Sequence, residues 1–191
     1  MAKVYQFLAD GFEDIEAWAP VDILRRGGVE VVTVSIMGCE FVESAHGVTV
    51  KADTTFEAAG DFSDADMLLL PGGMPGATNL RDHEQLAEVL LHQHQQGKRI
   101  GAICAAPMVL GGLGILKGKQ ATCYPGFEGF LTGAEYTADL VTEDGNITTG
   151  EGPAAALPYG YKILSYFREE EAVESIEIRQ FGRTERKLQI Y

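Results

Sequence analysis

The sequence predicts an α/β fold in which helices cover both faces of a mostly parallel central sheet. Short apolar segments rich in β-branched residues alternate with amphipathic segments of helical period between residues 4 and 168. The apolar segment Met67–Leu70 shows no polar alternation, which is typical of a strand buried on both faces. Alternating strands and helices form parallel sheets with right-handed connections. We therefore expect a three-layer sandwich that binds ligands at the carboxyl ends of its strands.

The first half of the chain contains three predicted strands and two predicted helices. The first helix follows a turn at Asp10-Gly11 and ends at Gly27-Gly28, because glycine accepts the left-handed conformation that closes a helix. Short hairpin strands are expected over Cys39–Lys51, around His46-Gly47. The strands are expected at Val4–Ala9, Val29–Ile36 and Met67–Leu70, and the helices at about Glu13–Arg26 and Asp82–Gln96.

The second half continues the same alternation. A strand over Arg99–Ile103 precedes a helix over Ala106–Leu116. A hairpin is expected around Asp144-Gly145-Asn146, a sequence that favours a tight turn. The last helix of this part is expected over Pro153–Arg168. Because Pro158 is unfavourable inside a helix, a start near Leu157 is the alternative.

Residues 1–170 are predicted to form one domain, and residues 171–191 a C-terminal extension of it. In this extension Ile176 and Ile178, and later Leu188 and Ile190, alternate with polar residues. Alternation of this kind indicates strands. We therefore expect a terminal hairpin that packs on the domain.

The composition of the 191-residue chain excludes several classes of protein. A net charge of −13 disfavours binding to nucleic acid or to anionic membrane surfaces. The longest uncharged stretch, Ile100–Leu116, is shorter than a membrane span and is interrupted by glycine and proline, so no membrane partner is expected. Three cysteines lack metal-site spacing, and no signal peptide is visible. These features predict a cytoplasmic protein with free thiols, without metal or cofactor.

The junction at Cys104 is the strongest functional signal in the sequence. The thiol ends an apolar strand and precedes a helix whose first turn contains Pro107. Free N–H groups and the helix dipole favour an anion there, so we expect a thiol of lowered pKa. A strand, sharp turn and helix also form the nucleophile elbow of serine hydrolases. An inert buried cysteine is the alternative interpretation.

Three loops with unusual chemistry leave the carboxyl ends of predicted strands and should converge there: 10–16, 71–73 and 104–107. These loops also carry a family resemblance. The matching segments are Asp10-Gly11-Phe12-Glu13-Asp14-Ile15-Glu16, Pro20-Val21-Asp22-Ile23-Leu24-Arg25-Arg26-Gly27-Gly28, Leu70-Pro71-Gly72-Gly73, Asn79-Leu80, Ala102-Ile103-Cys104-Ala105-Ala106-Pro107 and Gly152-Pro153. Over about residues 3–168 the chain resembles the ThiJ/PfpI superfamily, which includes the parkinsonism-associated deglycase. The resemblance implies a flavodoxin-like fold and a homodimer.

The resemblance also assigns roles to matching positions. Cys104 corresponds to the reactive cysteine, and Glu16 to the acidic residue that touches the thiol. Gly72, Gly73 and Ala105 fall where backbone N–H groups of the family form a site resembling an oxyanion hole. If Glu16 contacts Cys104, we expect a raised pKa for the carboxyl group, a lowered pKa for the thiol and a shared titration.

Two departures from the family pattern limit the function that the resemblance implies. Many relatives have a histidine where this chain has Tyr124, and a phenol is a poor base near pH 7. The protease-like branch has a histidine directly after the cysteine, where this chain has Ala105. His46 is the remaining histidine whose loop falls near the dimer-related site of the family. Cys123 is expected near the pocket, either as a resolving thiol or as an inert strand residue.

Four functions remain open at this stage. The leading hypothesis is addition of Cys104 to a small reactive carbonyl compound, as in a glyoxalase or deglycase. The second is a non-catalytic oxidation sensor or chaperone-like protein whose partner is an oxidant. A cysteine peptidase or amidase is disfavoured by the missing histidines. A flavin or nucleotide module is disfavoured because no phosphate-binding glycine motif is present.

Overall fold

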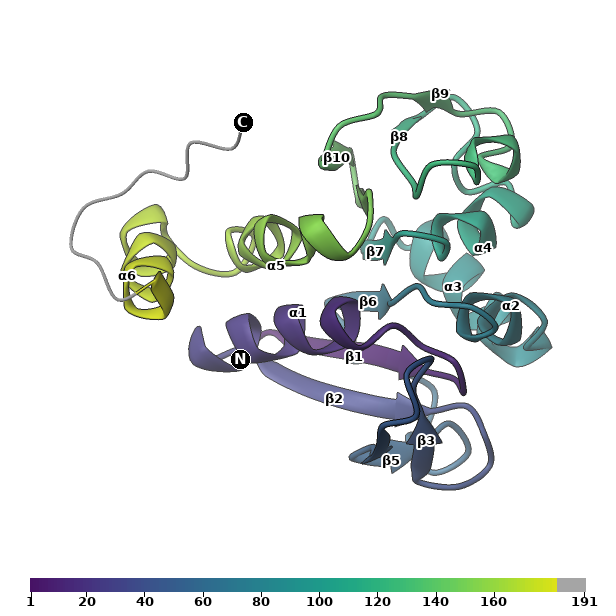
Figure 1. Ribbon diagram of the computed structural model, residues 1–191, viewed down its shortest axis with the longest axis horizontal. Coiled ribbons are helices and arrows are strands. Elements are labelled where there is room, and N and C mark those ends of the chain that lie inside the picture. The colour runs from purple at the N-terminus through teal and green to yellow at the C-terminus, as the bar shows by residue number, and fades with distance from the viewer. Residues whose placement is uncertain (182–191) are drawn as a thin grey trace.

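The structure, a computed structural model, describes residues 1–181 and is built around a seven-stranded sheet (Figure 1). The strand order is β10-β11-β7-β6-β1-β2-β5, and every neighbouring pair is parallel except β10 with β11. The prediction of a mostly parallel α/β sandwich is therefore confirmed. The strands are β1 (Lys3–Leu8), β2 (Glu30–Ser35), β5 (Thr54–Thr55), β6 (Met67–Leu70), β7 (Arg99–Ile103), β10 (Val141–Asp144) and β11 (Ile147–Gly150).

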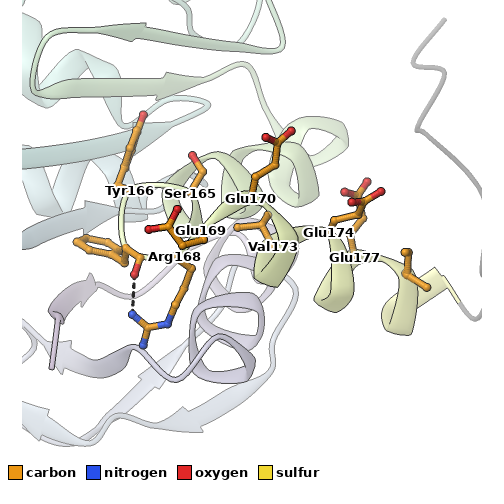
Figure 2. A pocket seen from close by; sticks show the side chains of 10 residues that line it. Ser165, Tyr166, Arg168, Glu169, Glu170, Val173, Glu174 and Glu177 are labelled. Atoms are coloured by element: carbon orange, nitrogen blue, oxygen red, sulfur yellow. Dashed lines mark hydrogen bonds between the residues drawn. The ribbon is translucent and has the colours of Figure 1, made fainter.

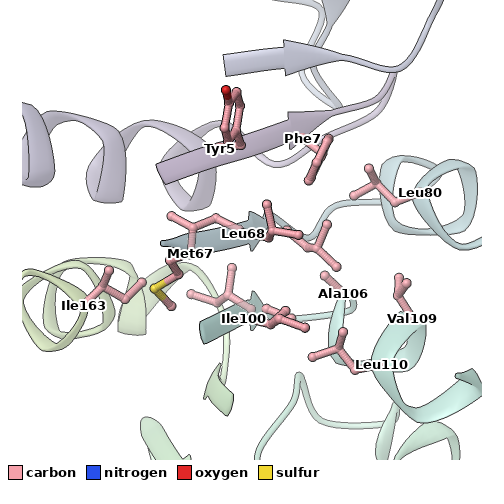
Figure 3. Packing of buried hydrophobic residues seen from close by; sticks show 14 of the residues in the cluster. Tyr5, Phe7, Met67, Leu68, Leu80, Ile100, Ala106, Val109, Leu110 and Ile163 are labelled. Carbon is pink, nitrogen blue, oxygen red and sulfur yellow. The ribbon is translucent and has the colours of Figure 1, made fainter. Parts of the chain in front are cut away.

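Helices cover both faces of this sheet. On one face α1 (Asp14–Arg26) packs along α5 (Ala156–Leu164). The other face carries α2 (Gly76–Arg81), α3 (Glu84–Gln95) and α4 (Pro107–Gly112). Figure 3 shows Met67 beside Ile163 of α5, and Leu80 and Val109 on the side of α2 and α4. Burial on both faces explains why β6 is apolar throughout.

The predicted hairpin in the first half is confirmed as β3 (Phe41–Glu43) paired with β4 (Thr49–Lys51). The predicted hairpin of β10 and β11 is confirmed as well. Sequence patterns did not indicate the short parallel pair β8 (Gln120–Ala121) and β9 (Glu135–Tyr136), nor the 3-10 turn η1 (Glu128–Phe130) between them. These elements are too short to produce a periodic pattern.

Two helices differ from their predicted bounds. The helix α4 ends at Gly112, before the predicted Leu116, because glycines at 111, 112 and 114 weaken it and Gly114 has φ +73°. The helix α5 begins at Ala156, after the 3-10 turn η2 (Pro153–Ala155). Pro158 therefore lies in the first turn of α5, as the alternative start near Leu157 predicted.

The predicted terminal hairpin is wrong where the structure describes it, because residues Glu170–Phe181 form the helix α6. Val173 and Ile176 are three residues apart and pack against the core, a spacing that belongs to a helix. The alternation of Ile176 with Ile178, which are two residues apart, matches the spacing of a strand and was misleading. Leu188 and Ile190 lie outside the described residues. The division into a domain of residues 1–170 and an extension of residues 171–191 stays a prediction.

The junction of α5 and α6 encloses a surface hollow (Figure 2). Four glutamates line it, namely Glu169, Glu170, Glu174 and Glu177. Arg168 anchors this junction, since its guanidinium group donates hydrogen bonds to the carbonyl oxygens of Gly27 and Gly28 at 2.6 and 2.7 Å. Because Gly28 precedes β2, the hollow lies at the amino edge of the sheet, opposite the loops that contain the candidate site.

Tyr159 provides a test of packing between α5 and the sheet. Its hydroxyl group is buried without a hydrogen-bond partner within residues 1–181, and it lies where a Cβ at Gly101 would stand. We expect Tyr159→Phe to stabilise the protein by about 1 kcal/mol, because it removes an unsatisfied buried polar group. Gly101→Ala should destabilise it by about 2 kcal/mol through overpacking.

Urea unfolding of both single variants and of the double variant measures these effects. The two substitutions should not be additive, because Tyr159→Phe removes part of the clash that Gly101→Ala creates. Additive changes in the free energy of unfolding would contradict the contact between Tyr159 and Gly101.

Candidate functional site

The candidate site lies where β1, β6 and β7, which are neighbours in the sheet, reach their carboxyl ends. The loop after β1 is tied to the loop after β6, since the Glu13 N–H donates to the Gly72 carbonyl oxygen at 2.9 Å. Asn79 of α2 also donates from its side-chain amide to the Asp10 carbonyl oxygen at 2.9 Å. Parallel strands place their loops together at one edge. The predicted convergence of the three loops is therefore present in the structure.

Cys104 occupies a strained turn between β7 and α4. Its φ of +65° lies in the left-handed region that side chains other than glycine rarely adopt. The Cys104 N–H donates to the Gly150 carbonyl oxygen at 2.8 Å, which holds the turn against the neighbouring strand β11. Strain of this kind persists only where the surrounding structure enforces it, and it is concentrated at functional sites. The Cys104 residue is 8% exposed, so only a small part of it contacts solvent.

Glu16, in the first turn of α1, reaches beneath the loop after β6 to the Cys104 side chain. The residue is only 1% exposed, and its carboxyl group lies beside the thiol. Its Oε2 accepts a hydrogen bond from the Gly72 N–H at 2.9 Å. Its Oε1 is buried without a conventional hydrogen-bond partner within residues 1–181. A proton on this carboxyl group could therefore be donated to the sulfur.

Two backbone N–H groups, those of Gly73 and Ala105, lie close enough to the Cys104 thiol to act against the increase of its pKa. Gly73 has φ +88°, and a Cβ there would overlap the backbone of Glu13. A Cβ at Gly72 would stand 2.7 Å from the Cys104 Cβ. The glycine pair is therefore needed for close approach of the loop. Two convergent N–H groups can stabilise negative charge on sulfur or on an oxygen attached to it.

Burial raises the pKa of Glu16 to about 7, and the negative charge of Glu13 adds to this effect. The contacts of the carboxyl group with Cys104 and with the Gly72 N–H lower its pKa and so oppose these two effects. The raised pKa of Glu16 agrees with the sequence prediction.

The pKa of the Cys104 thiol is raised, whereas a lowered pKa was expected. Burial is the largest cause, and the neighbouring Glu16 carboxylate adds to it, while the two backbone N–H groups oppose both. The single negative charge of the pair therefore resides mainly on Glu16, and a thiolate forms only when the proton moves to Glu16.

The segment after β8 forms another wall of the site. The Tyr124 N–H donates to the Cys104 carbonyl oxygen at 2.9 Å, and the side chain packs over Gly152. Tyr124 is 46% exposed, so its phenol ring faces solvent. Cys123 is fully buried, and burial together with the charges of Glu128 and Glu151 raises its pKa to about 11. This environment gives Cys123 little nucleophilic character.

His46 lies in the loop between β3 and β4 and does not contact Cys104. Its exposed ring is paired with a carboxylate in the first turn of α1, with 2.8 Å between His46 Nδ1 and Asp14 Oδ2. Within residues 1–181, no group of three or more His, Cys, Asp or Glu side chains is arranged to hold a metal ion.

Comparison with known proteins identifies the family. The family model described as "DJ-1/PfpI family" matches residues 2–166. This chain belongs to the DJ-1/PfpI family.

Individual relatives agree with this assignment. The chain is 36% identical to "Protein DJ-1 homolog B" from Arabidopsis thaliana over 90% of its own length, and spans 40% of that relative. It is 32% identical to a deglycase of Pyrococcus abyssi, with 79% of the chain and 90% of the relative covered. The solved structure "Toxoplasma gondii DJ-1, oxidized" superimposes with a TM-score of 0.90 at 35% identity, covering 97% of this chain and 100% of that one.

Within this DJ-1/PfpI chain, Glu13 is a site residue for which sequence reasoning assigned no role. Its carboxylate accepts a hydrogen bond from the Glu16 N–H at 2.7 Å and so caps α1. The same side chain raises the pKa of Glu16. An N-cap side chain commonly accepts a hydrogen bond from the N–H three residues later, so the spacing of Glu13 and Glu16 could have indicated this cap.

The shared proton predicts the pH dependence of Cys104 alkylation. As the pH rises through about 7 the pair loses one proton, and a fixed fraction of the resulting anion is thiolate with Glu16 protonated. The alkylation rate should therefore rise to a plateau above pH 7, and rise again only at much higher pH. In Glu16→Gln the inflection near pH 7 should disappear, leaving one later rise.

Alkylation by iodoacetamide, followed by mass spectrometry of the peptide that contains Cys104, measures this profile. Exposed Cys39 serves as a reference thiol in the same sample. An unchanged inflection near pH 7 in Glu16→Gln would show that another group controls the thiol.

Proposed function

We propose that this DJ-1/PfpI protein uses Cys104 as a nucleophile toward small reactive carbonyl compounds such as α-oxoaldehydes. The observation that supports this best is the strained Cys104 turn, which brings the thiol against the Glu16 carboxyl group and two backbone N–H groups. This arrangement combines a nucleophile, a proton carrier and anion stabilisation. The name of the Pyrococcus abyssi relative, a deglycase, also supports carbonyl chemistry.

In this proposal Glu16 moves a proton in each step. The carboxylate takes the thiol proton while sulfur bonds to the aldehyde carbon of methylglyoxal. The electron pair of the C=O double bond moves to oxygen, which takes the proton back from Glu16 to give a hemithioacetal. The N–H groups of Gly73 and Ala105 stabilise the transient negative charge. Tyr124 is given no part in proton abstraction, because a phenol is a poor base near pH 7.

The remaining steps convert the hemithioacetal into a 2-hydroxy acid. Glu16 removes the proton from the carbon bonded to sulfur, and the resulting enediol is reprotonated on the second carbon to give a thioester. Water then breaks the carbon–sulfur bond, which releases lactate and returns the thiol. The net reaction adds one water molecule to methylglyoxal and requires no cofactor.

Loss of methylglyoxal in the presence of wild type, Cys104→Ala and Glu16→Gln tests the proposal. Cys104→Ala should reduce the rate to that of buffer, since the nucleophile is lost. Glu16→Gln should reduce kcat by at least about 100-fold, the usual contribution of a positioned acid or base. Cys39→Ser, which changes an exposed thiol outside the site, is the matched control and should be unaffected. Equal rates in the wild type and both site variants would rule out the activity.

A non-catalytic oxidation sensor is the second candidate, because the same contacts suit an oxidised cysteine. The thiolate would attack one peroxide oxygen and release water to give a sulfenic acid, and a second peroxide would give a sulfinate. The oxygens attached to sulfur would then accept hydrogen bonds from Gly73, Ala105 and protonated Glu16. A similar solved structure is described as oxidized.

Mild hydrogen peroxide distinguishes this candidate by the order in which the cysteines react. Cys104 should gain two oxygens before Cys39 or Cys123 is modified, although Cys39 is the exposed thiol. Peptide mass spectrometry over a series of peroxide concentrations measures this order. Oxidation that follows exposure, with Cys39 first, would argue against a sensor.

We also propose a cytoplasmic homodimer. The three cysteines, all within the described residues, are free thiols, as expected in a reducing compartment. No helix among residues 1–181 has the length and apolar character needed to cross a membrane. Ile15 on α1 and Phe41 and Val48 on the adjoining hairpin are large apolar side chains that are half exposed or more, and a second copy would cover them. A monomer in sedimentation equilibrium at micromolar concentration would contradict the dimer.

A further inference from the structure

The loops around Cys104 carry many carboxylates and no compensating cation. Five segments surround the thiol: residues 10–16, 71–76, 104–107, 122–130 and 150–153. None of them contains a lysine or an arginine. They contain Asp10, Glu13, Asp14, Glu16, Glu128 and Glu151. The edge of the sheet at which Cys104 lies is therefore acidic.

Glu151 is the carboxylate that the fold places alongside Cys104. The register of β7 and β11 sets Gly150 opposite Ile103, so the next residue in each strand, Glu151 and Cys104, leave the sheet side by side. The Glu151 N–H is fixed by a hydrogen bond of 2.9 Å to the Leu140 carbonyl oxygen. Its negative charge also reaches Cys123, since it raises the pKa of that thiol. Glu151 therefore leaves the sheet next to Cys104 and carries a carboxylate within electrostatic reach of the neighbouring thiol, Cys123.

Glu128 adds a second negative charge on the same side. It lies in η1, in the segment whose Tyr124 N–H binds the Cys104 carbonyl oxygen. Its two carboxylate oxygens accept the Gly126 N–H at 2.9 and 3.0 Å, and this contact lowers the pKa of Glu128. It stays ionised at neutral pH.

The imidazole near this edge does not offset these charges. His46 is paired with Asp14 across 2.8 Å, so a proton on the ring would neutralise a carboxylate that is already present. An approaching carboxylate would therefore meet repulsion from Glu128 and Glu151, with no lysine or arginine in these segments to offset it.

We propose that Glu151 and Glu128 make the Cys104 site selective for neutral and cationic carbonyl compounds over those that carry a carboxylate. This selectivity rests on the proposed function, and it narrows the substrate class. Methylglyoxal and carbonyl adducts of amines would be accepted, whereas α-oxoacids such as glyoxylate would be excluded.

Alkylation by a charge-matched pair of reagents tests the selectivity without requiring turnover. Iodoacetamide is neutral and iodoacetate is anionic, and they are nearly equal in size. The rate of Cys104 alkylation by iodoacetamide is divided by the rate by iodoacetate, once in the folded protein and once in urea. Comparison with the ratio in urea removes the intrinsic difference between the reagents. We expect the ratio in the folded protein to be several-fold higher than the ratio in urea.

Variants of the two carboxylates identify the source of the discrimination. Glu151→Gln and Glu128→Gln should each lower the ratio by about twofold, the effect of a unit charge about 10 Å away in water. Glu30→Gln at the amino edge of the sheet is the matched control and should leave the ratio unchanged. Raising the salt from 50 mM to 1 M should reduce the wild-type ratio, because screening shortens to about 3 Å. A folded ratio equal to the unfolded one, or one insensitive to both variants, would overturn the proposal.

Turnover separates this proposal from the proposed function. With methylglyoxal and glyoxylate as substrates, kcat/KM should favour methylglyoxal, and Glu151→Gln should reduce the preference. Equal kcat/KM values for the two substrates would overturn the selectivity while supporting carbonyl chemistry. Absence of turnover with both substrates, together with a high alkylation ratio, would overturn the carbonyl activity and leave charge selection at Cys104 supported.

Discussion

The contact between the Glu16 carboxyl group and the Cys104 thiol is the interaction on which the site depends. Two acids buried side by side cannot both be charged without a large free-energy cost, so they hold a single negative charge between them. The Gly72 N–H stabilises that charge on Glu16, whereas the Gly73 and Ala105 N–H groups stabilise it on sulfur. The raised pKa of the thiol places that charge mainly on Glu16, and the sulfur is charged only when Glu16 holds the proton. Proton transfer to Glu16 is therefore what gives this buried thiol access to nucleophilic chemistry.

The strand order makes this contact possible between segments that are far apart in the sequence. Glu16 follows β1, the glycine pair follows β6 and Cys104 follows β7, and these strands are consecutive in the sheet. The backbone hydrogen bond from Glu13 to Gly72 then locks the first helix to the glycine loop. Because α1 also packs along α5, the position of Glu16 is fixed by the core and not by the loop alone.

Elements with a strong periodic or apolar pattern could be predicted from the sequence, and those set by long-range contacts could not. Met67–Leu70 was predicted with its observed bounds because its four consecutive apolar residues form one uninterrupted segment. The helix α6 was missed, since Ile176 and Ile178 have the spacing of a strand, whereas the helical pair Val173 and Ile176 is recognised only from its packing against the core. The pairing of β8 with β9 depends on contacts that two-residue strands do not encode.

The site was predicted unevenly for related reasons. The position of Cys104 at a strand–helix junction follows from local sequence, and the convergence of the loops follows from the sheet. The pKa of the thiol was predicted in the wrong direction, because the sequence shows the helix dipole and the N–H groups but not the burial. The negative charge of the Glu16 carboxylate is a second cause of the raised pKa, because it disfavours a negative charge on the sulfur. Burial emerges only when the whole core is assembled.

The left-handed backbone at Cys104 has a consequence for the engineering of this protein. A glycine at this position would relieve the steric strain of φ +65° and would raise the thermal stability if the cavity cost is small. A library selected for heat resistance alone would therefore accumulate molecules that have lost the sulfur. Stability and reactivity compete at this single residue, so a selection for thermostable variants also needs a screen for a reactive thiol.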